Sequence, residues 1–476
     1  MLSLDDKIYK REVLPLEAIF IRSMGAIIGV AAEISGEIFE DKFKIAVNKV
    51  KSTYPILNCA LTWDENGKPW FQKSKIDPLV IIKERVLEND YEKIIVEEWN
   101  KTFDLINGPL CRFILLKSKE KSNIIFIAHH ILSDGIGLTI IIESILKFMK
   151  DKNLNTEISY INKLPSIENL KPKNNFNILF NQLLYKYISS FLNYRWERSK
   201  IHLPPEDAML THEIFFNSYE YCPINDELSE EETTNFIKKC KENKVTVTCA
   251  MATAFLACRN EIDKEHDNSR QMIPVNLRRH LDNESKKAVN CHAGSIDIKY
   301  SYDDSKSFWE NSKIYNKLIK NALKNFSDVK KIQVISNFPT DLLETSILSQ
   351  RIQTFEDMFG NVFSYADKLG SKSNHVTSMI AKYVMKQNPT FCLTNMGTPE
   401  FSDNYGPLKI EKMFIYPSGV VYPAMSILLS TVTLNNRLFL SFNIAKKKSE
   451  KFEDREYIAL RLKERYKRFL TKDIFI

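Results

Sequence analysis

Two adjacent histidines and an aspartate interrupt an otherwise apolar run, NIIFIAHHILSDGIGLTIIIESIL. His129 and His130 stand side by side, Asp134 follows four residues after His130, and Gly135 comes next. A neutral imidazole has a pKa near ~6.5, so it can take a proton from a hydroxyl, an amine or a thiol and return it. His130 is therefore a candidate general base. Asp134 can shape the same loop, or hold it through an ion pair with a distant arginine.

The glycine and the rarity of the pattern favour a functional role for this segment. Gly135 permits a sharp turn or the close approach of a substrate. The alternative is that His129 and His130 are core histidines with satisfied hydrogen bonds. The chain has 8 histidines and 13 glycines in 476 residues, so chance seldom joins a histidine pair, an aspartate and a glycine at this spacing.

The flanking pattern predicts how this loop is positioned. The stretch CRFILLKSKEKSNIIFIAHH indicates a β-hairpin with a polar turn at 117–123, which places the histidines at the end of its second strand. After Gly135 and Gly137, apolar residues at helical spacing predict a helix. We therefore expect a strand, a short polar loop and a helix.

Other stretches of both halves predict mixed strands and helices. Phe43, Ala46, Val47 and Val50 share one face of a predicted helix, and Ala459, Leu462, Tyr466 and Phe469 share one face of a C-terminal helix. Asn66-Gly67 and Asn435-Asn436 predict hairpin turns. A helix is expected from about 306 to 326, and KKCKENKVTVTCAMATAFLACRNE predicts a strand-like entry followed by an apolar helix. Residues 151–175 predict a surface connection.

Length and composition indicate a soluble protein of two domains. A chain of 476 residues exceeds the usual size of one core. The apolar fraction of 44% and the charged fraction of 27% are ordinary for globular proteins. The net charge of +7 is spread in mixed-sign clusters. That pattern argues against nucleic-acid binding and leaves a mild preference for small anionic ligands.

Cysteine usage and hydropathy favour a cytoplasmic location. The eight cysteines show no C-x-x-C spacing, as expected for free thiols in a cytosolic protein. The first residues carry acids where a signal peptide needs basic residues, and we expect no spanning helix. The apolar stretch 176–198 predicts a helix with three alternative roles. It packs on a neighbouring domain, covers an apolar substrate as a lid, or contacts a membrane surface.

Other catalytic constellations are missing from the sequence. It contains no HExxH, no Cys/His cluster with metal spacing, no GxSxG and no P-loop, so no metal site is expected. His292 beside Cys291 suggests a thiol nucleophile or, more simply, a core histidine. The remaining histidines stand in polar stretches and are predicted at the surface: His202, His212, His266, His280 and His375.

The segment HHILSDG resembles the HHxxxDG motif of the chloramphenicol-acetyltransferase-like superfamily. That superfamily includes nonribosomal peptide condensation domains, alcohol acetyltransferases, polyketide-associated acyltransferases and wax ester synthases. Further segments resemble family landmarks in the family's order over nearly the whole chain: LPLEAIF, YPILNCALTWDENGKPWF, FDLINGPLCRFILL, IPVNLRRHL, LTNMG and TLNNRLFLSF.

The resemblance implies an α+β fold. It consists of two chloramphenicol-acetyltransferase-like α/β sandwich domains in a V, with a tunnel between them. On this basis we expect a first domain over 1–165, a connecting segment with the apolar helix over 166–210, and a second domain over 211–476. A late crossover segment near 390–410 is expected to lie over the first half.

The resemblance also assigns roles to residues of the candidate site. His130 would deprotonate the acceptor, and His129 would be architectural. Asp134 would be ion-paired, with Arg278 as the preferred partner and Arg279 as the alternative. Asn395 and Asn276 would have either a direct polar role near the channel or a role in loop structure.

The resemblance further implies an acyltransferase that moves an acyl group from a thioester to a hydroxyl or amine. The donor would be acyl-CoA or a phosphopantetheine thioester, with no permanently bound cofactor, and an acyl carrier protein is a possible partner. The DFGWG motif of plant BAHD acyltransferases is absent, which argues against that branch. Gly137 stands where condensation domains often carry serine, which favours ester formation by a free-standing enzyme over peptide-bond synthesis, with an amine still open as the acceptor. We expect a monomer of secondary metabolism. The alternatives are a catalytically silent scaffold that recruits a carrier protein or other partner, and a lipid acyltransferase at a membrane surface.

Overall fold

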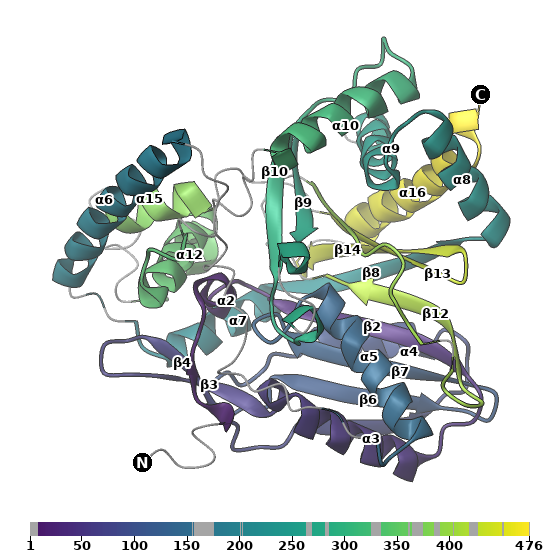
Figure 1. Ribbon diagram of the computed structural model, residues 1–476, viewed down its shortest axis with the longest axis horizontal. Helices are drawn as coiled ribbons and strands as arrows, with labels where there is room; N and C mark the ends of the chain where they lie inside the picture. The colour runs from purple at the N-terminus through teal and green to yellow at the C-terminus, as the bar shows by residue number, and fades with distance from the viewer. Residues whose placement is uncertain are drawn as a thin grey trace.

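The computed structural model describes most of the chain. The described residues are 8–154, 156, 176–199, 201, 203–262, 269–280, 285–324, 335–359, 362–363, 375–384, 391–402, 404–417, 427–449 and 452–475. Two lobes are visible in Figure 1, and a group of helices lies beside them. The expected α+β class with two lobes is confirmed. His202 and His266 lie outside the described residues, as does nearly all of the predicted connection 151–175.

A five-stranded sheet in the order β12-β2-β7-β6-β5 forms the first lobe. Its strands are β2 (Ile27–Ser35), β5 (Leu79–Glu84), β6 (Cys111–Lys117), β7 (Lys121–His129) and β12 (Lys409–Tyr416). β2 and β7 are buried along nearly their whole length, which explains why both read as continuous apolar runs. The accompanying helices are α3 (Glu40–Thr53), α4 (Asp90–Trp99) and α5 (Gly135–Lys150).

A small three-stranded sheet in the order β1-β4-β3 adjoins this lobe. It contains β1 (Arg11–Glu12), β3 (Cys59–Trp63) and β4 (Pro69–Lys73), and η1 (Pro55–Asn58) leads into β3. Gly67 has a φ of 78° in the β3–β4 turn, a conformation that glycine adopts without a Cβ penalty. The hairpin predicted at Asn66-Gly67 is therefore present.

A six-stranded sheet in the order β10-β9-β11-β13-β14-β8 forms the second lobe. Its strands are β8 (Tyr219–Leu228), β9 (Arg270–Asn276), β10 (Ala293–Lys299), β11 (Phe391–Asn395), β13 (Ile427–Leu434) and β14 (Arg437–Lys447). Its helices are α8 (Glu230–Glu242), α9 (Val247–Ile262), α10 (Phe308–Lys324) and α16 (Phe452–Thr471). Short 3-10 turns are η4 (Leu277–His280), η5 (Ser285–Lys287) and η6 (Asp473–Phe475).

The chain crosses between the lobes late in the sequence. β11 pairs with β9 and β13 in the second lobe, whereas β12 pairs antiparallel with β2 in the first. Between these strands, Ser402 N donates to Glu143 Oε1 of α5 at 3.2 Å. The two sheets are thus tied together by the chain segment that runs from β11 to β12.

A third group of helices packs beside the sheets. It contains α2 (Pro15–Ile21), α6 (Phe176–Ser199), α7 (Glu206–Ser218), α12 (Thr340–Thr354), α13 (Glu356–Phe359) and α15 (His375–Val384). α12 contacts α2 and α15, and Trp196 Nε1 of α6 donates to Asp341 Oδ2 at 2.7 Å. Although α12 follows residue 211, its buried side chains join the core of the first lobe.

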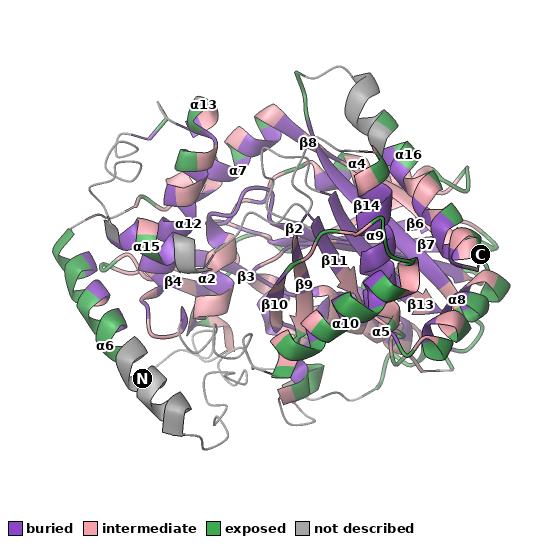
Figure 2. Ribbon diagram, turned by 90° about the horizontal axis from the view of Figure 1, so that it is seen from above, coloured by how far each residue is buried: buried purple, intermediate pink, exposed green. Residues whose placement is uncertain are grey.

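Burial follows the predicted helical faces. Phe43, Ala46, Val47 and Val50 are buried in α3, and Ala459, Leu462, Tyr466 and Phe469 are buried in α16; Figure 2 shows the buried residues gathered in the sheets and on the inner helix faces. The strand-like entry predicted before the apolar helix is wrong, because α8 occupies residues 230–242 and α9 begins at Val247. Thr246 Oγ1 accepts from Cys249 N at 3.3 Å, so Thr246 caps a helix.

Candidate active site

His130 directly follows β7, the central strand of the first-lobe sheet, and lies where that strand ends. His129 N donates to Leu110 O at 2.9 Å, and His130 N donates to Ala26 O at 2.8 Å. The backbone is therefore held by neighbouring segments on both sides up to the last residue before the loop. His129 is buried, whereas His130 is partly exposed, so only the second imidazole of the pair can meet a ligand.

Two contacts fix the ring of His130 and its tautomer. Nδ1 lies 2.9 Å from Ser133 O. Because a carbonyl oxygen can only accept, Nδ1 carries the proton, and Nε2 of the neutral ring keeps its lone pair. Phe20 of α2 stacks on the imidazole with the ring centroids 4.0 Å apart and an interplanar angle of 15°. Burial lowers the pKa of His130 from its usual value, so the ring is neutral near pH 7.

Asp134 is the N-cap of α5 and receives three donors. Its Oδ1 accepts from Gly137 N at 3.0 Å, and its Oδ2 accepts from His292 N at 2.8 Å and from Arg278 Nη1. Burial alone would raise the pKa of Asp134, but the Arg278 guanidinium and these hydrogen bonds outweigh burial and lower it. The carboxylate is therefore charged, and its three donors hold it in place at the start of α5.

The partner of Asp134 comes from the second lobe. Arg278 lies in η4 just after β9, is 2% exposed, and also donates through Nη2 to Ala288 O at 3.1 Å and Asn290 O at 3.0 Å. Arg279, the alternative from the sequence, is exposed and donates from Nε to His280 Nε2 at 3.0 Å. The ion pair thus joins the two lobes beside the histidine loop. Removing one partner of such a buried pair typically costs about 3–5 kcal/mol.

Asn276 and Asn395 both hold loop backbone. Asn276 Oδ1 accepts from Arg278 N at 2.9 Å, which orients the arginine at the end of β9. Asn395 Oδ1 accepts from Gly397 N at 2.9 Å, and its Nδ2 donates to Thr248 Oγ1 at 2.9 Å. These contacts favour the loop-structure alternative for both asparagines.

Gly135 and Gly137 lie in the first turn of α5, where close packing leaves no room for a side chain. A Cβ on Gly135 would lie 2.7 Å from Met396 Sδ, and a Cβ on Gly137 would lie 2.0 Å from Ser133 Oγ. Gly135 therefore admits the segment that follows β11, and Gly137 admits the serine whose carbonyl holds His130. The sequence singled out Gly135 but gave Gly137 no structural part.

The buried histidines around the loop stay neutral. His129 Nδ1 accepts from Ile131 N at 3.3 Å, and its ring meets that of His212 edge to face at 5.1 Å. Burial lowers the pKa of His129 well below its usual value and that of His212 to about 4. The prediction that His212 is at the surface is wrong, because its Nε2 lies 2.9 Å from Ile21 O inside the molecule.

His292 and Phe20 were not recognised as parts of the site from the sequence. His292 is buried, in agreement with the core alternative, and its backbone N–H supports Asp134. Phe20 stacks on His130 from 110 residues away in the chain. Among the described residues no group of three or more histidine, cysteine, aspartate or glutamate side chains could hold a metal ion.

Comparison with known proteins identifies the class of this fold. Residues 14–165 match the family model described as Condensation domain. The chain is 29% identical over 124 residues to tyrocidine synthase 3 of Brevibacillus parabrevis, which is 25% of this chain and 2% of that protein. It is 23% identical over 336 residues to bacitracin synthase 3 of Bacillus licheniformis, which is 66% of this chain and 5% of that protein. The chain thus spans only a small part of the curated relatives that it matches.

Solved structures share the whole fold at low sequence identity. The first condensation domain of the calcium-dependent antibiotic synthetase, in complex with a substrate analogue, gives a TM-score of 0.59 at 12% identity and covers 98% of this chain and 96% of that chain. Polyketide synthase associated protein 5 from Mycobacterium tuberculosis gives 0.59 at 12% identity, with coverage of 99% and 100%. Trichothecene 15-O-acetyltransferase from Fusarium sporotrichioides gives 0.55 at 15% identity, with coverage of 98% and 96%.

The match over residues 14–165 confirms the resemblance to condensation domains for that part of the chain. The same match supports a condensation role. The structural likenesses, at these identities, show the fold. No helix in the described part of the chain is long and apolar enough to cross a membrane.

Proposed function

We propose that this protein is an acyltransferase that moves an acyl group from a thioester to a hydroxyl or amine acceptor, with His130 as the general base. The observation that carries the proposal is the state of the imidazole. Nδ1 is engaged by Ser133 O, Phe20 fixes the ring plane, and Nε2 makes no hydrogen bond with the described residues. A basic nitrogen held in this way at a strand end is suited to accept a proton from a bound nucleophile.

The proposed reaction balances without a covalent enzyme intermediate. Nε2 of His130 removes the acceptor proton while the acceptor oxygen or nitrogen attacks the thioester carbonyl carbon. The tetrahedral intermediate then collapses with cleavage of the carbon–sulfur bond, and the proton passes from His130 to the leaving thiolate. Because Nδ1 remains bonded to Ser133 O throughout, the ring keeps its orientation while its charge changes.

The Asp134–Arg278 pair supports this chemistry through positioning. Asp134 caps α5 one residue after Ser133, and Arg278 anchors it to the second lobe. The carbonyl that holds His130 is therefore fixed relative to both lobes. We assign Asp134 and Arg278 as positioning residues, and we assign His129, Gly135, Asn276 and Asn395 to the structure that surrounds the base.

The proposed donor is acyl-CoA or an acyl group on the phosphopantetheine arm of a carrier protein, and no permanently bound cofactor is required. The curated relatives are peptide synthases, which favours a carrier protein as partner. We further propose a monomeric, cytoplasmic enzyme of secondary metabolism.

The test is transfer with purified protein. Acetyl-CoA, and separately an acetylated phosphopantetheine thioester, are incubated with a panel of alcohols and amines while free thiol is measured. We expect acceptor-dependent thiol release in the wild type and its loss in His130→Ala. No release with any donor, together with specific binding of a carrier protein, would instead support the catalytically silent scaffold.

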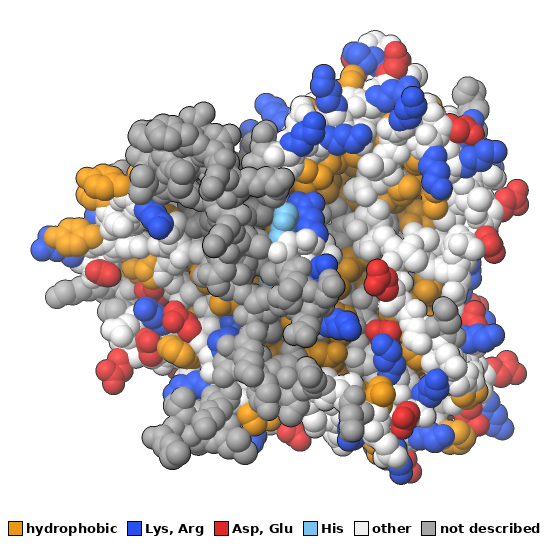
Figure 3. Space-filling model, in the orientation of Figure 1, with side chains coloured by type: hydrophobic (Ala, Val, Ile, Leu, Met, Phe, Trp, Pro, Cys, Tyr) orange, Lys and Arg blue, Asp and Glu red, His pale blue; other side chains and the backbone are white. Residues whose placement is uncertain are grey.

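A second proposal concerns the exposed face of α6. Tyr187 (76% exposed), Phe191 (55%) and Tyr194 (53%) point outward, whereas Leu192 and Trp196 pack inward. Figure 3 shows separate apolar side chains beside Lys and Arg side chains at the left edge of the molecule, where Figure 1 places α6. Lys186, Arg195 and Arg198 are exposed on the same helix, and cationic side chains are attracted to anionic lipid. We propose contact of α6 with an anionic lipid surface, which flotation with anionic vesicles tests; no flotation, or equal flotation of a variant with serine at the three aromatic positions, would contradict it.

A further inference from the structure

A buried ion pair anchors the short helix that carries Phe20. Arg22 is the C-cap residue of α2, and its Nε donates to Glu344 Oε2 of α12 at 3.0 Å. The side chain of Arg22 is 0% exposed and that of Glu344 is 2% exposed. The second oxygen, Glu344 Oε1, accepts from Trp63 Nε1 of β3 at 3.1 Å. The pair joins residues that are 322 positions apart in the chain, and Figures 1 and 2 both show α12 beside α2.

Glu344 is the charged partner of Arg22, and the other contacts at this end of α2 are neutral. Arg22 Nη2 donates to Pro204 O at 3.1 Å, and His212 Nε2 lies 2.9 Å from Ile21 O. A buried guanidinium that loses its carboxylate is an uncompensated charge, which is strongly destabilising. The buried position of Arg22, and with it the end of α2, therefore depends on Glu344.

The end of α2 determines where the ring of Phe20 lies. Phe20 stands two residues before Arg22, in the last turn of a helix of seven residues, and its ring stacks on the imidazole of His130. The hydrogen bond from Nδ1 to Ser133 O holds one edge of the imidazole, whereas the stacked ring restricts the tilt of its plane. A shift of the end of α2 would therefore change the direction in which Nε2 of His130 points.

We propose that Glu344 is a positioning residue for the base. Through Arg22 it holds the end of α2, and through Phe20 it holds the plane of the His130 imidazole. A displacement of about 1 Å at a reacting group can cost about 10²-fold in rate, so a residue of a neighbouring helix affects turnover when it sets the direction of Nε2. The effect on turnover rests on the proposed function, whereas the effect on the ring stack does not.

The first measurement is the ring-current shift of His130, which reports the stack without any substrate. The full chain is labelled with ¹³C-histidine, and the ring resonances of His130 are assigned by their loss in His130→Ala. Phe20→Leu gives their position without an aromatic neighbour. Glu344→Gln removes the charge that holds Arg22 and keeps an oxygen that accepts from Trp63. We expect Glu344→Gln to move the His130 resonances from the wild-type position toward the Phe20→Leu position.

A matched control makes the same chemical change in another buried ion pair. Glu33 Oε2 lies 2.7 Å from Arg85 Nη2, with side chains that are 4% and 6% exposed, toward the end of β2 that is remote from the histidine loop. Glu33→Gln should lower the free energy of unfolding and leave the His130 resonances at their wild-type positions. If Glu344→Gln does not fold, Arg22→Met combined with Glu344→Gln carries the test, because it leaves no uncompensated buried charge.

The second measurement is steady-state turnover with a donor and an acceptor that the wild type uses. In Glu344→Gln we expect kcat to fall at least about 10-fold and KM to stay close to the wild-type value, because a misdirected base slows proton transfer and leaves the binding contacts in place.

The outcomes separate this proposal from the proposed function. Wild-type His130 resonances in folded Glu344→Gln, or an equal shift in Glu33→Gln, overturn the positioning role. An unchanged kcat in a variant whose resonances have moved overturns its importance for turnover. If the wild type transfers no acyl group, the proposed function fails, and the resonances still decide whether Glu344 positions the imidazole.

Discussion

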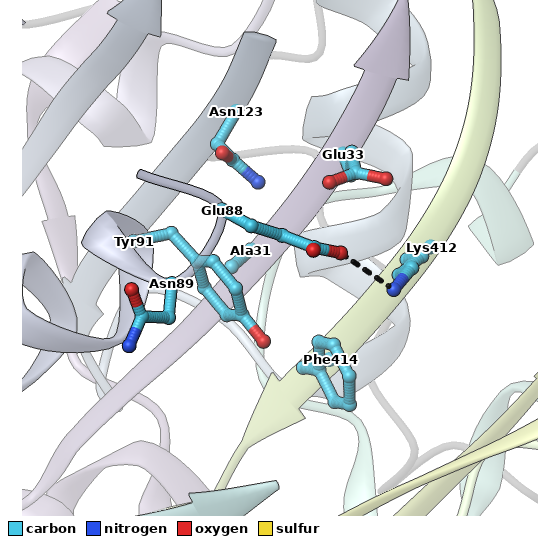
Figure 4. A pocket seen from close by; sticks show the side chains of 8 residues that line it. All are labelled: Ala31, Glu33, Glu88, Asn89, Tyr91, Asn123, Lys412 and Phe414. Atoms are coloured by element: carbon cyan, nitrogen blue, oxygen red, sulfur yellow. Dashed lines mark hydrogen bonds and ion pairs between the residues drawn. The ribbon is translucent and has the colours of Figure 1, made fainter. Parts of the chain in front are cut away.

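Strand β7 has polar residues at each end, and the two ends differ in how their buried polar side chains are hydrogen-bonded. At the histidine loop, the carboxylate of Asp134 receives Gly137 N, His292 N and the Arg278 guanidinium. At the other end, beside a pocket lined by Tyr91 and Phe414 (Figure 4), Glu33 Oε2 accepts from Arg85 Nη2 and Lys121 Nζ lies 3.7 Å from Glu33 Oε1. Asn123 Oδ1 has no donor among the described residues. The first region is fixed by the protein itself and leaves one nitrogen free for chemistry. The second balances its carboxylate with two cations and leaves one buried amide oxygen without a donor among the described residues.

The largest effect is expected at the nitrogen that the histidine loop leaves free. His130→Ala should reduce turnover by about 10²–10⁴-fold, the usual contribution of a general base. The melting temperature should stay close to that of the wild type, because the ring is partly exposed and one neutral hydrogen bond and one stacking contact are lost. Steady-state kinetics and calorimetry on the same preparation measure both.

A matched control for His130→Ala is His280→Ala, in a partly buried histidine of η4. It should retain activity. Full activity of folded His130→Ala would remove the basis for the proposed base.

The second effect concerns the ion pair that joins the lobes. Asp134→Ala strands the buried Arg278 guanidinium, and the free energy of unfolding should fall by about 3–5 kcal/mol. Asp134→Ala combined with Arg278→Met should cost less than the sum of the single changes, because no uncompensated charge remains. Urea denaturation of the four proteins gives the coupling energy, and strict additivity would show that the pair is not energetically coupled.

The third effect separates the two glycines of the loop. Gly137→Ala places a Cβ against Ser133 Oγ, so we expect a loss of about 1–3 kcal/mol. Gly135→Ala should cost less, because it meets the flexible end of Met396. The double variant Ser133→Ala/Gly137→Ala should recover stability lost in Gly137→Ala, as measured by urea denaturation; no recovery would place the clash elsewhere.

The fourth effect is a pH dependence of stability from the buried histidines. Burial lowers the pKa of His212 and His292 to about 4 each. Between pH ~6.5 and pH ~4 the unfolded chain then binds more protons than the folded chain, so stability is lost as the pH falls through this window. His212→Asn should lower the number of protons taken up on unfolding by roughly one, which the pH dependence of the urea midpoint reveals. An unchanged slope would contradict a neutral buried imidazole at this position.

Local sequence patterns predicted helices, strands and turns, but they did not predict contacts between residues that are distant in the sequence. The Asn435-Asn436 turn was predictable because both residues adopt left-handed φ angles of 50° and 58° that asparagine tolerates. Residues 245–247 looked strand-like for their β-branched side chains, but Thr246 caps a helix there.

The residues of the candidate site show the same difference between what the local sequence predicts and what it does not. The histidine segment stands out in the sequence, and Arg278 was preferred as the partner of Asp134 through a family resemblance. Phe20 and His212 carried no local sign of their role, because their positions depend on how α2 and α7 pack against the end of β7. The pocket was equally hidden, since β12 reaches β2 only through the crossing between lobes.

The smallest effect completes the comparison at the other end of β7. Asn123→Leu removes a buried amide oxygen that has no donor among the described residues, and it keeps a side chain of similar size. Stability should therefore change by no more than about 1 kcal/mol. Asp134→Ala, one strand and one loop away, should cost several times as much. A large loss in Asn123→Leu, measured by urea denaturation without ligand, would mean that the amide is already satisfied within the protein. The contrast between the fully bonded Asp134 carboxylate and the unbonded Asn123 amide oxygen would then no longer hold.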